Sequence, residues 1–372
     1  MSNSRQNVLI VLGTRPEAIK LAPVIVGLRK RPEKFTVSVA TTGQHHDLVA
    51  PILDFFEISP DYDLGIMQSD QTPASIVERT LARLDPILEE QRFDRLIVQG
   101  DTSSALAAGL AGFYRKIPVA HVEAGLRSGE WDDPFPEEIN RRLIAQLADL
   151  HFAPTEGNRD YLLREGISQK RIHITGNTVI DALHAIIDRT KDEDIHEEIE
   201  DLEGKKIILL TTHRRENFGE RQQGIFEAIN SLLELHDDLA VIFPVHPNPN
   251  VRSTVQDVLC PNKRLHLLDP VDYIGFVRLM KASWLIMTDS GGIQEEAPAL
   301  GVPVFVTRKT TERKEVLETG NSLLVGTSSD IIVQEVEALF KDEEKHKSMA
   351  RPAFPFGQGG AVEKIQALLF QK

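Results

Sequence analysis

Cysteine is almost missing from this chain, and long apolar runs are missing altogether. Cys260 is the single cysteine among 372 residues, which excludes an intrachain disulfide and a zinc site built from several cysteines. No apolar stretch approaches the roughly 20 residues that a membrane-spanning helix requires. The N-terminal segment carries only a short apolar run and no cleavage-site pattern, so we expect no signal peptide. These absences favour the cytoplasm.

Several common functional motifs are absent as well. No G-x-G-x-x-G run follows an expected strand and no G-x-x-x-x-G-K-[ST] run occurs, so a dinucleotide fingerprint and a Walker-type ATPase site are both missing. HExxH and EF-hand patterns do not occur either. His45, His46 and Asp47 are adjacent, and adjacent side chains diverge on most backbones. We therefore interpret them as surface or supporting residues and predict no metal site.

Basic residues are outnumbered by acidic ones. The formal net charge of -14 argues against nucleic acid or an anionic membrane as the main partner. It leaves open an anionic ligand, because a few basic side chains can dominate one cleft. The chain is longer than a single hydrophobic core usually supports, so two domains are expected.

Short apolar runs alternate with longer helical patterns, which is typical of a parallel sheet covered by helices. The expected strands form two series, at residues 8–12, 36–41, 96–99, 119–122 and 151–153 and at residues 206–210, 241–244, 265–267, 284–288 and 302–306. The acidic stretch 189–204 separates the series and is interpreted as a solvated helix near a domain junction. Residues 360–371 are expected to form a last helix.

The two series open in a similar way. GTRPEAIK brings Arg15 and Lys20 to the turn after the first strand, and TTHRRENFG brings His213, Arg214 and Arg215 to the equivalent turn of the second series. Either turn alone is explained by an ordinary solvated helix entrance. Their recurrence favours a shared anion in a cleft between two sheets, outside the carboxyl ends of the strands.

The segment SGGIQEE follows a buried strand and Asp289. A turn of Ser290, Gly291 and Gly292 before a helix aims backbone N–H groups at phosphate oxygens. Glu295 and Glu296 then stand in the first helical turn, where a carboxylate can accept hydrogen bonds from ribose hydroxyls. A simple capped helix explains the same residues equally well, so both interpretations stay open.

Carboxylates end core strands in the first series. Asp101 closes VQGD, Glu123 closes HVEAG, and Glu137 opens PEEINRR with Arg141 four residues later. Each could cap a neighbouring helix instead of acting in chemistry. Three such groups opposite a phosphate site favour proton transfer beside a bound phosphate ester.

The motifs GTRPEAIK, GDTSSALA, HVEAGLRSG, PEEINRR, TGNTVIDAL, HRREN, PVHPNPN and TDSGGIQEEAP occur in this order between about residues 8 and 326. This order resembles the non-hydrolysing UDP-N-acetylglucosamine 2-epimerases. The resemblance implies two Rossmann-like domains facing a cleft, the α/β glycosyltransferase-B architecture, with the C-terminal helix crossing back to the first domain. It implies domains at 1–172 plus 357–372 and at 173–356, a homodimer and no cofactor.

The resemblance also implies roles for individual residues. Asp101, Glu123 and Glu137 would be the acid–base carboxylates, and His213 would stabilise the departing diphosphate. The residues implied to bind the UDP-sugar are Arg15, Lys20, Arg141, Phe276, Ser290, Gly291, Gly292, Glu296 and Arg313. The implied reaction inverts C2 through UDP elimination, a bound glycal and UDP re-addition, and supplies N-acetylmannosamine for surface polysaccharide.

Two segments depart from the pattern of the family. RKTTERKE carries Lys309 and Lys314 at altered places. TGQHHDL keeps Gln44 and His45 of the family's allosteric segment but has His46 and Leu48 where arginine and methionine are usual. Weak or altered activation by substrate is therefore expected.

Four other functions stay open at this stage. A 2-epimerase of a modified sugar, such as a UDP-diacetamido-uronic acid, differs only in loops that the sequence does not place. A hydrolysing epimerase would release UDP with turnover, and a glycosyltransferase of the same fold would need an acceptor. A nucleotide-sugar sensor would bind without C2 proton exchange. Fold alone separates none of these.

Overall fold

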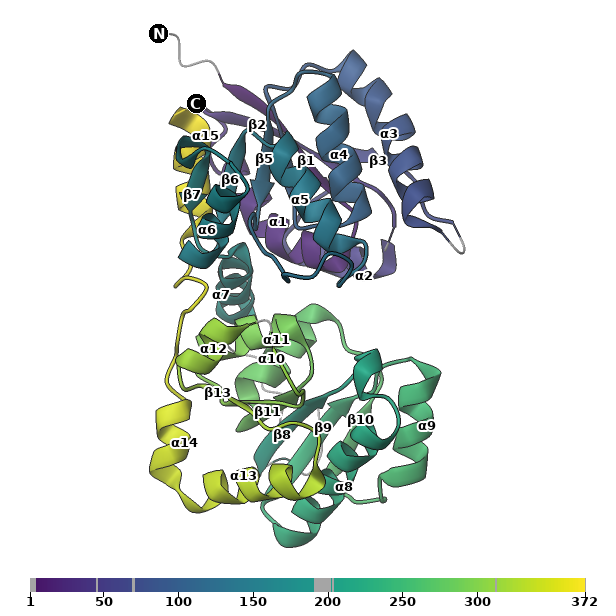
Figure 1. Ribbon diagram of the computed structural model, residues 1–372, viewed down its shortest axis with the longest axis vertical. Helices are drawn as coiled ribbons and strands as arrows, with labels where there is room; N and C mark the ends of the chain where they lie inside the picture. The colour runs from purple at the N-terminus through teal and green to yellow at the C-terminus, as the bar shows by residue number, and fades with distance from the viewer. Residues whose placement is uncertain are drawn as a thin grey trace. The chain divides into compact units, whose positions relative to one another are not determined.

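The computed structural model describes residues 5–44, 46–68, 71–190, 202, 204–311 and 313–371. The chain divides into two compact units (Figure 1). The first unit runs to Ala185 and resumes at Phe356, and the second spans Ile186–Pro355. Each unit holds one parallel sheet between helices, so the expected pair of Rossmann-like α/β units is confirmed.

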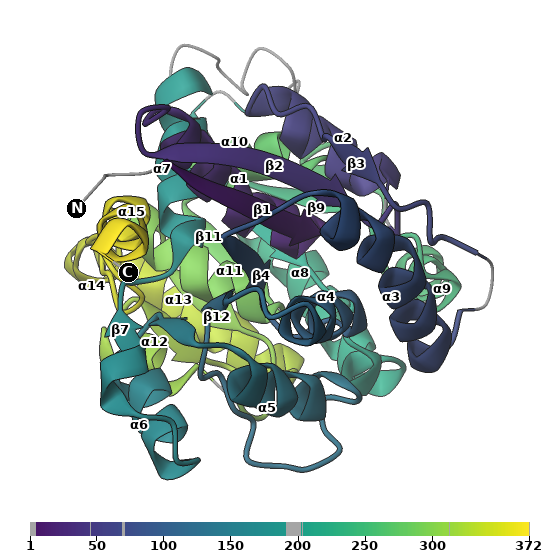
Figure 2. The ribbon, with the colours of Figure 1, turned by 90° about the horizontal axis from the view of Figure 1, so that it is seen from above.

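The sheet of the first unit has the strand order β3-β2-β1-β4-β5-β6-β7, with every neighbouring pair parallel. Figure 2 shows β1 and β2 side by side. The order reverses between β1 and β4, which makes that position the switch point of the sheet. The strands are β1 (Gln6–Leu12), β2 (Phe35–Thr41), β3 (Tyr62–Asp63), β4 (Arg95–Gln99), β5 (Val119–Val122), β6 (Leu150–Ala153) and β7 (Ile172–Ile174).

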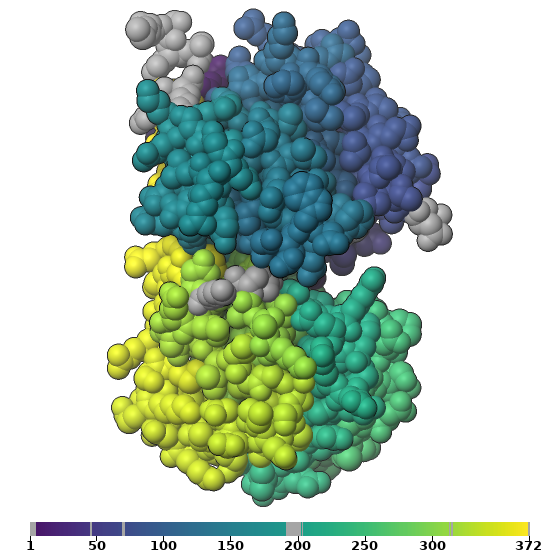
Figure 3. Space-filling model, in the orientation of Figure 1, coloured from purple at the N-terminus to yellow at the C-terminus, as the bar shows by residue number. Residues whose placement is uncertain are grey.

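Helices cover this sheet, and in the space-filling view blue and teal residues form most of the visible face of the first unit (Figure 3). Parallel strands need such cover because they are buried on both faces, which explains their near-continuous apolar sequences. The helices are α1 (Arg15–Arg29), α2 (His46–Phe55), α3 (Pro73–Glu90), α4 (Ser103–Tyr114), α5 (Glu137–Leu147), α6 (Glu156–Arg164), α7 (Thr178–Thr190) and α15 (Ala361–Gln371).

The second unit repeats this plan with the strand order β10-β9-β8-β11-β12-β13, again all parallel. Its switch point lies between β8 and β11. The strands are β8 (Lys206–Thr211), β9 (Leu239–Pro244), β10 (Leu265–Leu268), β11 (Leu285–Thr288), β12 (Val304–Val306) and β13 (Ser322–Leu324). The helices are α8 (Glu220–Leu235), α9 (Pro249–Val258), α10 (Tyr273–Ala282), α11 (Gly291–Glu296), α12 (Lys314–Glu318), α13 (Ser329–Lys341) and α14 (Glu343–Met349).

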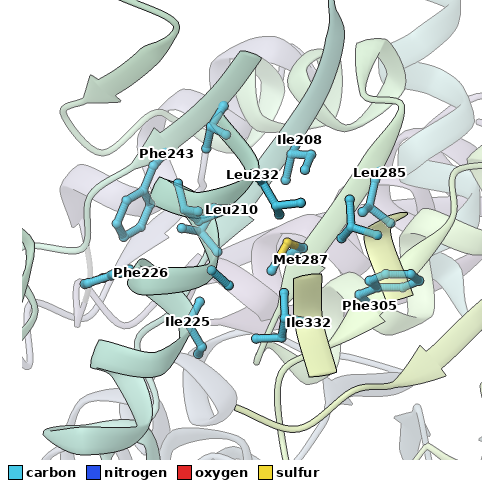
Figure 4. Close-up of a cluster of buried hydrophobic side chains, with 14 of the residues drawn as sticks. Ile208, Leu210, Ile225, Phe226, Leu232, Phe243, Leu285, Met287, Phe305 and Ile332 are labelled. Atoms are coloured by element: carbon cyan, nitrogen blue, oxygen red, sulfur yellow. The ribbon is translucent and has the colours of Figure 1, made fainter. Parts of the chain in front are cut away.

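One face of the second sheet packs on α8 and α13 (Figure 4). Ile208 and Met287 from the two central strands meet Phe226 of α8 and Ile332 of α13, and all four are fully buried. Burying each side chain of this size contributes about 2 kcal/mol. The core therefore fixes the strands whose carboxyl ends carry the polar turns described below.

The structure confirms the expected strands to within about two residues at each end and adds β3, β7 and β13. These three have two or three residues each, too few for a hydrophobic pattern. Because the sequence pattern did not reveal β7, the predicted end of the first domain at residue 172 is wrong. Residue 172 begins a strand that pairs with β6, and the first unit continues to Ala185. Most of the acidic stretch 189–204 lies outside the described residues. Among the described helices none is long and apolar enough to cross a membrane.

The C-terminal helix α15 belongs to the first unit, as expected (Figure 1). Its N-terminus is capped by Asp181 of α7, whose carboxylate accepts hydrogen bonds from the backbone N–H groups of Gly360 (3.0 Å) and Ala361 (3.3 Å). At its other end Gln6 of β1 donates to the carbonyl of Leu369 (2.9 Å). The first and last segments of the chain are thus joined within one unit.

We predict that Asp181→Ala loosens α15. The substitution leaves N–H groups at the start of α15 without their acceptor and removes a negative charge from the positive end of the helix, a change of about 1–2 kcal/mol. Hydrogen exchange of residues 361–371 should accelerate accordingly, by about 5–30-fold. The matched control is Asp188→Ala, which changes an exposed residue of α7, the helix that carries Asp181. Equal exchange rates in the two variants would show that the cap does not hold α15.

Candidate functional site

A buried carboxylate ties together two turns at the switch point of the first sheet. Glu17, in the first turn of α1, accepts hydrogen bonds from the backbone N–H groups of Gly13 and Thr14 (2.7 Å each) and from the Thr102 hydroxyl (2.6 Å). Burial raises the pKa of Glu17, and these hydrogen bonds act in the opposite direction. The turns after β1 and β4 are therefore held as one piece.

Glu123 stands at the carboxyl end of β5 with its backbone in the left-handed region, at φ 63°. Its side chain is 9% exposed and contacts the Lys20 ammonium and the Gln99 amide, while Asn177 donates to it at 3.0 Å. A left-handed backbone is rare outside glycine and persists where the surroundings determine it. The structure thus places Lys20, a residue predicted to bind the UDP-sugar, beside Glu123.

Asp101 lies two residues beyond the end of β4 and forms an ion pair with Arg141 of α5 (2.5 Å). Burial raises the pKa of Asp101, the Arg141 charge lowers it, and the negative charge of Glu123 raises it further. Two carboxylates of one sheet edge therefore influence each other, and Asp101 holds a proton more readily than an exposed aspartate. Such a pair can pass protons to and from a bound molecule.

The two glutamates of PEEINRR begin α5 but differ in burial and in their partners. Glu138 is fully buried, accepts from the Ser128 backbone N–H (3.0 Å), and pairs with Arg141 (3.2 Å) and Arg142 (2.8 Å). Although its burial acts to raise the pKa of Glu138, these hydrogen bonds and the Arg141 charge together lower it. Glu137, by contrast, is half-buried at the first position of the helix. Within α5 the partner of Arg141 is thus Glu138 at i−3, where the sequence pattern had suggested Glu137 at i−4.

In the second unit, Asp289 links the turns at the switch point between β8 and β11. Its Oδ2 atom accepts hydrogen bonds at 3.0 Å from the Thr212 hydroxyl, from the backbone N–H groups of His213 and Arg214 and from the Asn217 amide. The turn after β8 is therefore built around this carboxylate. Sequence reasoning did not assign Asp289 a role, although a charged residue directly after a buried strand and before SGG was the signal for one.

Helix α11 follows Asp289 in the sequence after one residue. Ser290 is its N-cap and Gly291 and Gly292 are its first residues. Glu296 accepts a hydrogen bond from the Tyr273 hydroxyl (2.7 Å), and Glu295 pairs with Arg313 (2.7 Å). The structure thus brings Ser290, Gly291, Gly292, Glu296 and Arg313 together at one end of the second sheet.

The remaining predicted residues occupy diverse positions. Arg15 is exposed at the first position of α1, and Phe276 is half-buried in α10. Gln44 accepts a hydrogen bond from Ser104 at 3.4 Å, while His45 lies outside the described residues. Leu48 is 52% exposed on α2. Lys309 is exposed, and Lys314 begins α12.

Two buried histidines lie beneath the first site, in register on β5 and β6. His121 contacts the Gly100 carbonyl through Nε2 (2.7 Å), and burial lowers its pKa to about 4. Burial also lowers the pKa of His151 to about 3. Because the unfolded chain binds these protons near the ordinary value of 6.5, the folded state loses stability as the pH falls through 6.5 towards the lower values.

We predict that His151→Leu makes the protein less sensitive to acid. Between about pH 7.5 and pH 5 one such histidine costs about 2 kcal/mol of folding free energy, and leucine carries no titrating group. Urea unfolding at the two pH values, followed by circular dichroism, measures the difference. The wild type should lose more stability than the variant, and equal losses would contradict the assignment.

The chain was compared with known proteins and protein families. The family model described as UDP-N-acetylglucosamine 2-epimerase matches residues 28–370. The UDP-N-acetylglucosamine 2-epimerases of Escherichia coli (strain K12) and Bacillus subtilis (strain 168) are 48% and 44% identical, and each alignment covers at least 95% of both chains. A structure of the Neisseria meningitidis UDP-GlcNAc 2-epimerase bound to UDP-GlcNAc superposes with a TM-score of 0.90 at 43% identity, covering 98% of this chain and 100% of that one. The chain therefore belongs to the UDP-N-acetylglucosamine 2-epimerase family, a family of isomerases with the glycosyltransferase-B fold.

Proposed function

We propose that this protein interconverts UDP-N-acetylglucosamine and UDP-N-acetylmannosamine by inverting C2 of the sugar. The names of the relatives support the substrate, and the Neisseria meningitidis relative was solved with UDP-GlcNAc bound. The observation that carries the proposal is that two carboxylates at the carboxyl ends of neighbouring strands each form an ion pair, Glu123 with Lys20 and Asp101 with Arg141. Such a pair suits a reaction that removes a proton from one face of a carbon and returns it to the other.

In this proposal the second unit holds UDP. Ser290, Gly291 and Gly292 bind phosphate oxygens at the start of α11, the two glycines through their backbone N–H groups. The backbone N–H of Ser290 donates to the Thr288 hydroxyl (2.9 Å). Glu296, held by Tyr273 through one oxygen, accepts hydrogen bonds from the ribose. Phe276 faces the uracil. The diphosphate is bound by positive or hydrogen-bonding groups of Arg313 and His213, together with Arg15, which belongs to the first unit.

The proposed reaction is an elimination followed by an addition. A carboxylate takes the C2 proton, the electron pair of that C–H bond forms a C1–C2 double bond, and the C1–O bond breaks with its electrons on the diphosphate. UDP then adds back to the glycal while a second carboxyl group delivers a proton to the opposite face of C2. The raised pKa of Asp101 suits it to carry that proton, with Glu123 or Glu137 as the base. The two half-reactions balance without an oxidant or reductant, so no cofactor is needed.

We further propose that the enzyme acts in the cytoplasm as a homodimer and that its product supplies N-acetylmannosamine for surface polysaccharide. The homodimer and the use of the product rest on the resemblance to the family. Gel filtration with light scattering tests the oligomeric state directly.

The first test is proton NMR of the protein with UDP-GlcNAc in D2O. UDP-ManNAc carrying deuterium at C2 is the expected product. Binding without exchange at C2 would contradict the proposal and favour a modified-sugar substrate or a sensor. Release of UDP in step with turnover would instead indicate a hydrolysing epimerase.

Two variants test the carboxylates. Glu123→Gln and Asp101→Asn remove one acid–base group each and should lower the rate of C2 exchange by about 100- to 10,000-fold, while UDP binding measured by calorimetry changes little. Glu130→Gln, an exposed residue of the loop before α5, serves as the control and should retain its rate. Unchanged exchange in both site variants would remove these groups from the mechanism.

We propose in addition that activation by substrate is weak or altered, because His46 and Leu48 replace the usual arginine and methionine of the allosteric segment. Hyperbolic kinetics in UDP-GlcNAc are expected, with little stimulation of the reverse reaction when UDP-GlcNAc is added. Clearly sigmoidal kinetics together with strong stimulation would refute this prediction.

A further inference from the structure

Asp289 contacts His213 through a side-chain atom as well as through the backbone. The carboxylate Oδ1 atom lies 3.2 Å from the imidazole Nδ1 atom. Asp289 is fully buried, whereas the His213 side chain is 40% exposed. A ligand can therefore reach the imidazole, while the carboxylate behind it is closed to solvent.

The hydrogen bonds around Asp289 determine which imidazole nitrogen carries a proton. Four donors of the turn 212–217 converge on Oδ2, and the His213 backbone N–H also lies 3.2 Å from Oδ1, so both oxygens of Asp289 act as acceptors. An ionised carboxylate accepts hydrogen bonds and donates none. The His213 nitrogen that faces it must therefore be Nδ1–H, so Nε2 is the acceptor of the neutral ring.

A second contact fixes the plane of the ring. The His246 imidazole stacks on His213 with 5.7 Å between the ring centroids and an interplanar angle of 24°. An edge contact to Asp289 and a face contact to His246 leave the ring little freedom to turn over. Both the tautomer and the orientation of His213 are thus set within the second unit.

We propose that Asp289 is a positioning residue that acts through His213. This inference rests on the proposed function, in which His213 stabilises the diphosphate as the C1–O bond breaks. With Nδ1–H held by Asp289, Nε2 is the atom that meets the diphosphate. It does so as the N–H donor of a doubly protonated ring, and the negative charge of Asp289 compensates the positive charge of that ring. Asp289 itself touches no substrate.

A purely structural role for Asp289 is the alternative, because the same carboxylate holds the turn after β8. Asn217 provides the matched control for that role. Its amide donates to Asp289 Oδ2 (3.0 Å) and to the Thr307 carbonyl (3.1 Å). Asn217→Ala therefore loosens the same turn and leaves the imidazole contact of Asp289 in place.

The tautomer is measured directly by nitrogen-15 NMR of the full chain labelled at histidine, with His213→Gln identifying the His213 signals. The wild type and Asn217→Ala should show the proton on Nδ1. Asp289→Asn should shift His213 towards the Nε2–H form, because the amide NH2 group can turn to Nδ1 and no longer requires a proton there. An unchanged His213 signal in Asp289→Asn would overturn the proposal.

Kinetics separate positioning from structure. Asp289→Asn should lower kcat by about 100-fold or more, with KM changed by less than about threefold. In a His213→Gln background the same substitution should cost less than about twofold, because the two residues act as one unit. An equal loss of kcat with and without His213, or an equal loss in Asn217→Ala, would show that Asp289 acts only on the turn.

Two further results keep the test decisive. If Asp289→Asn does not fold, Asp289→Glu retains the negative charge but displaces it by one methylene group. Loss of kcat in that variant must then accompany a changed His213 signal. If the wild type does not epimerise UDP-GlcNAc, the proposed function fails, and the NMR comparison still decides whether Asp289 sets the His213 tautomer.

Discussion

A buried carboxylate at the switch point of each sheet is the constraint on which the polar turns of each unit depend. Glu17 joins the turns after β1 and β4, and Asp289 joins the turns after β8 and β11. Each accepts hydrogen bonds from backbone N–H groups and from a threonine hydroxyl of the adjoining turn. Parallel strands end at this edge with unpaired backbone groups, and an unpaired buried group costs about 1–3 kcal/mol. The two carboxylates satisfy these groups and thereby give each turn one conformation.

The two units have the same arrangement of strands but carry different polar groups at the strand ends. In the first unit the strand ends carry acids that face cations, Glu123 with Lys20 and Asp101 with Arg141. In the second unit the strand ends carry donors, from the start of α11 and from His213. In the reaction that we propose, proton transfer uses the first set and the departing diphosphate uses the second. The common strand order positions each set at a switch point, where open α/β sheets bind their ligands.

Much of this arrangement could be predicted from the sequence because apolar runs and turn motifs are local signals. The long strands, the SGG helix entrance and the carboxylates at strand ends all follow from patterns a few residues long. Pairings over long distances do not. Arg141 follows two glutamates at helical spacing, and only the packing of α5 shows that Glu138 is the buried partner. The role of Asp289 depends on a turn 75 to 77 residues earlier in the chain, which no local pattern reveals.

The backbone of Glu123 indicates how strongly its side-chain position is determined. A left-handed conformation costs a residue with a Cβ atom about 1–2 kcal/mol, and glycine would avoid that cost. Glu123 keeps the conformation while its carboxylate is held by Lys20 of α1, Gln99 of β4 and Asn177 before α7. Three donors from three separate segments offset the strain and fix the carboxylate at the end of β5. A capping role needs only one helix end, so this convergence favours a group whose position serves a ligand.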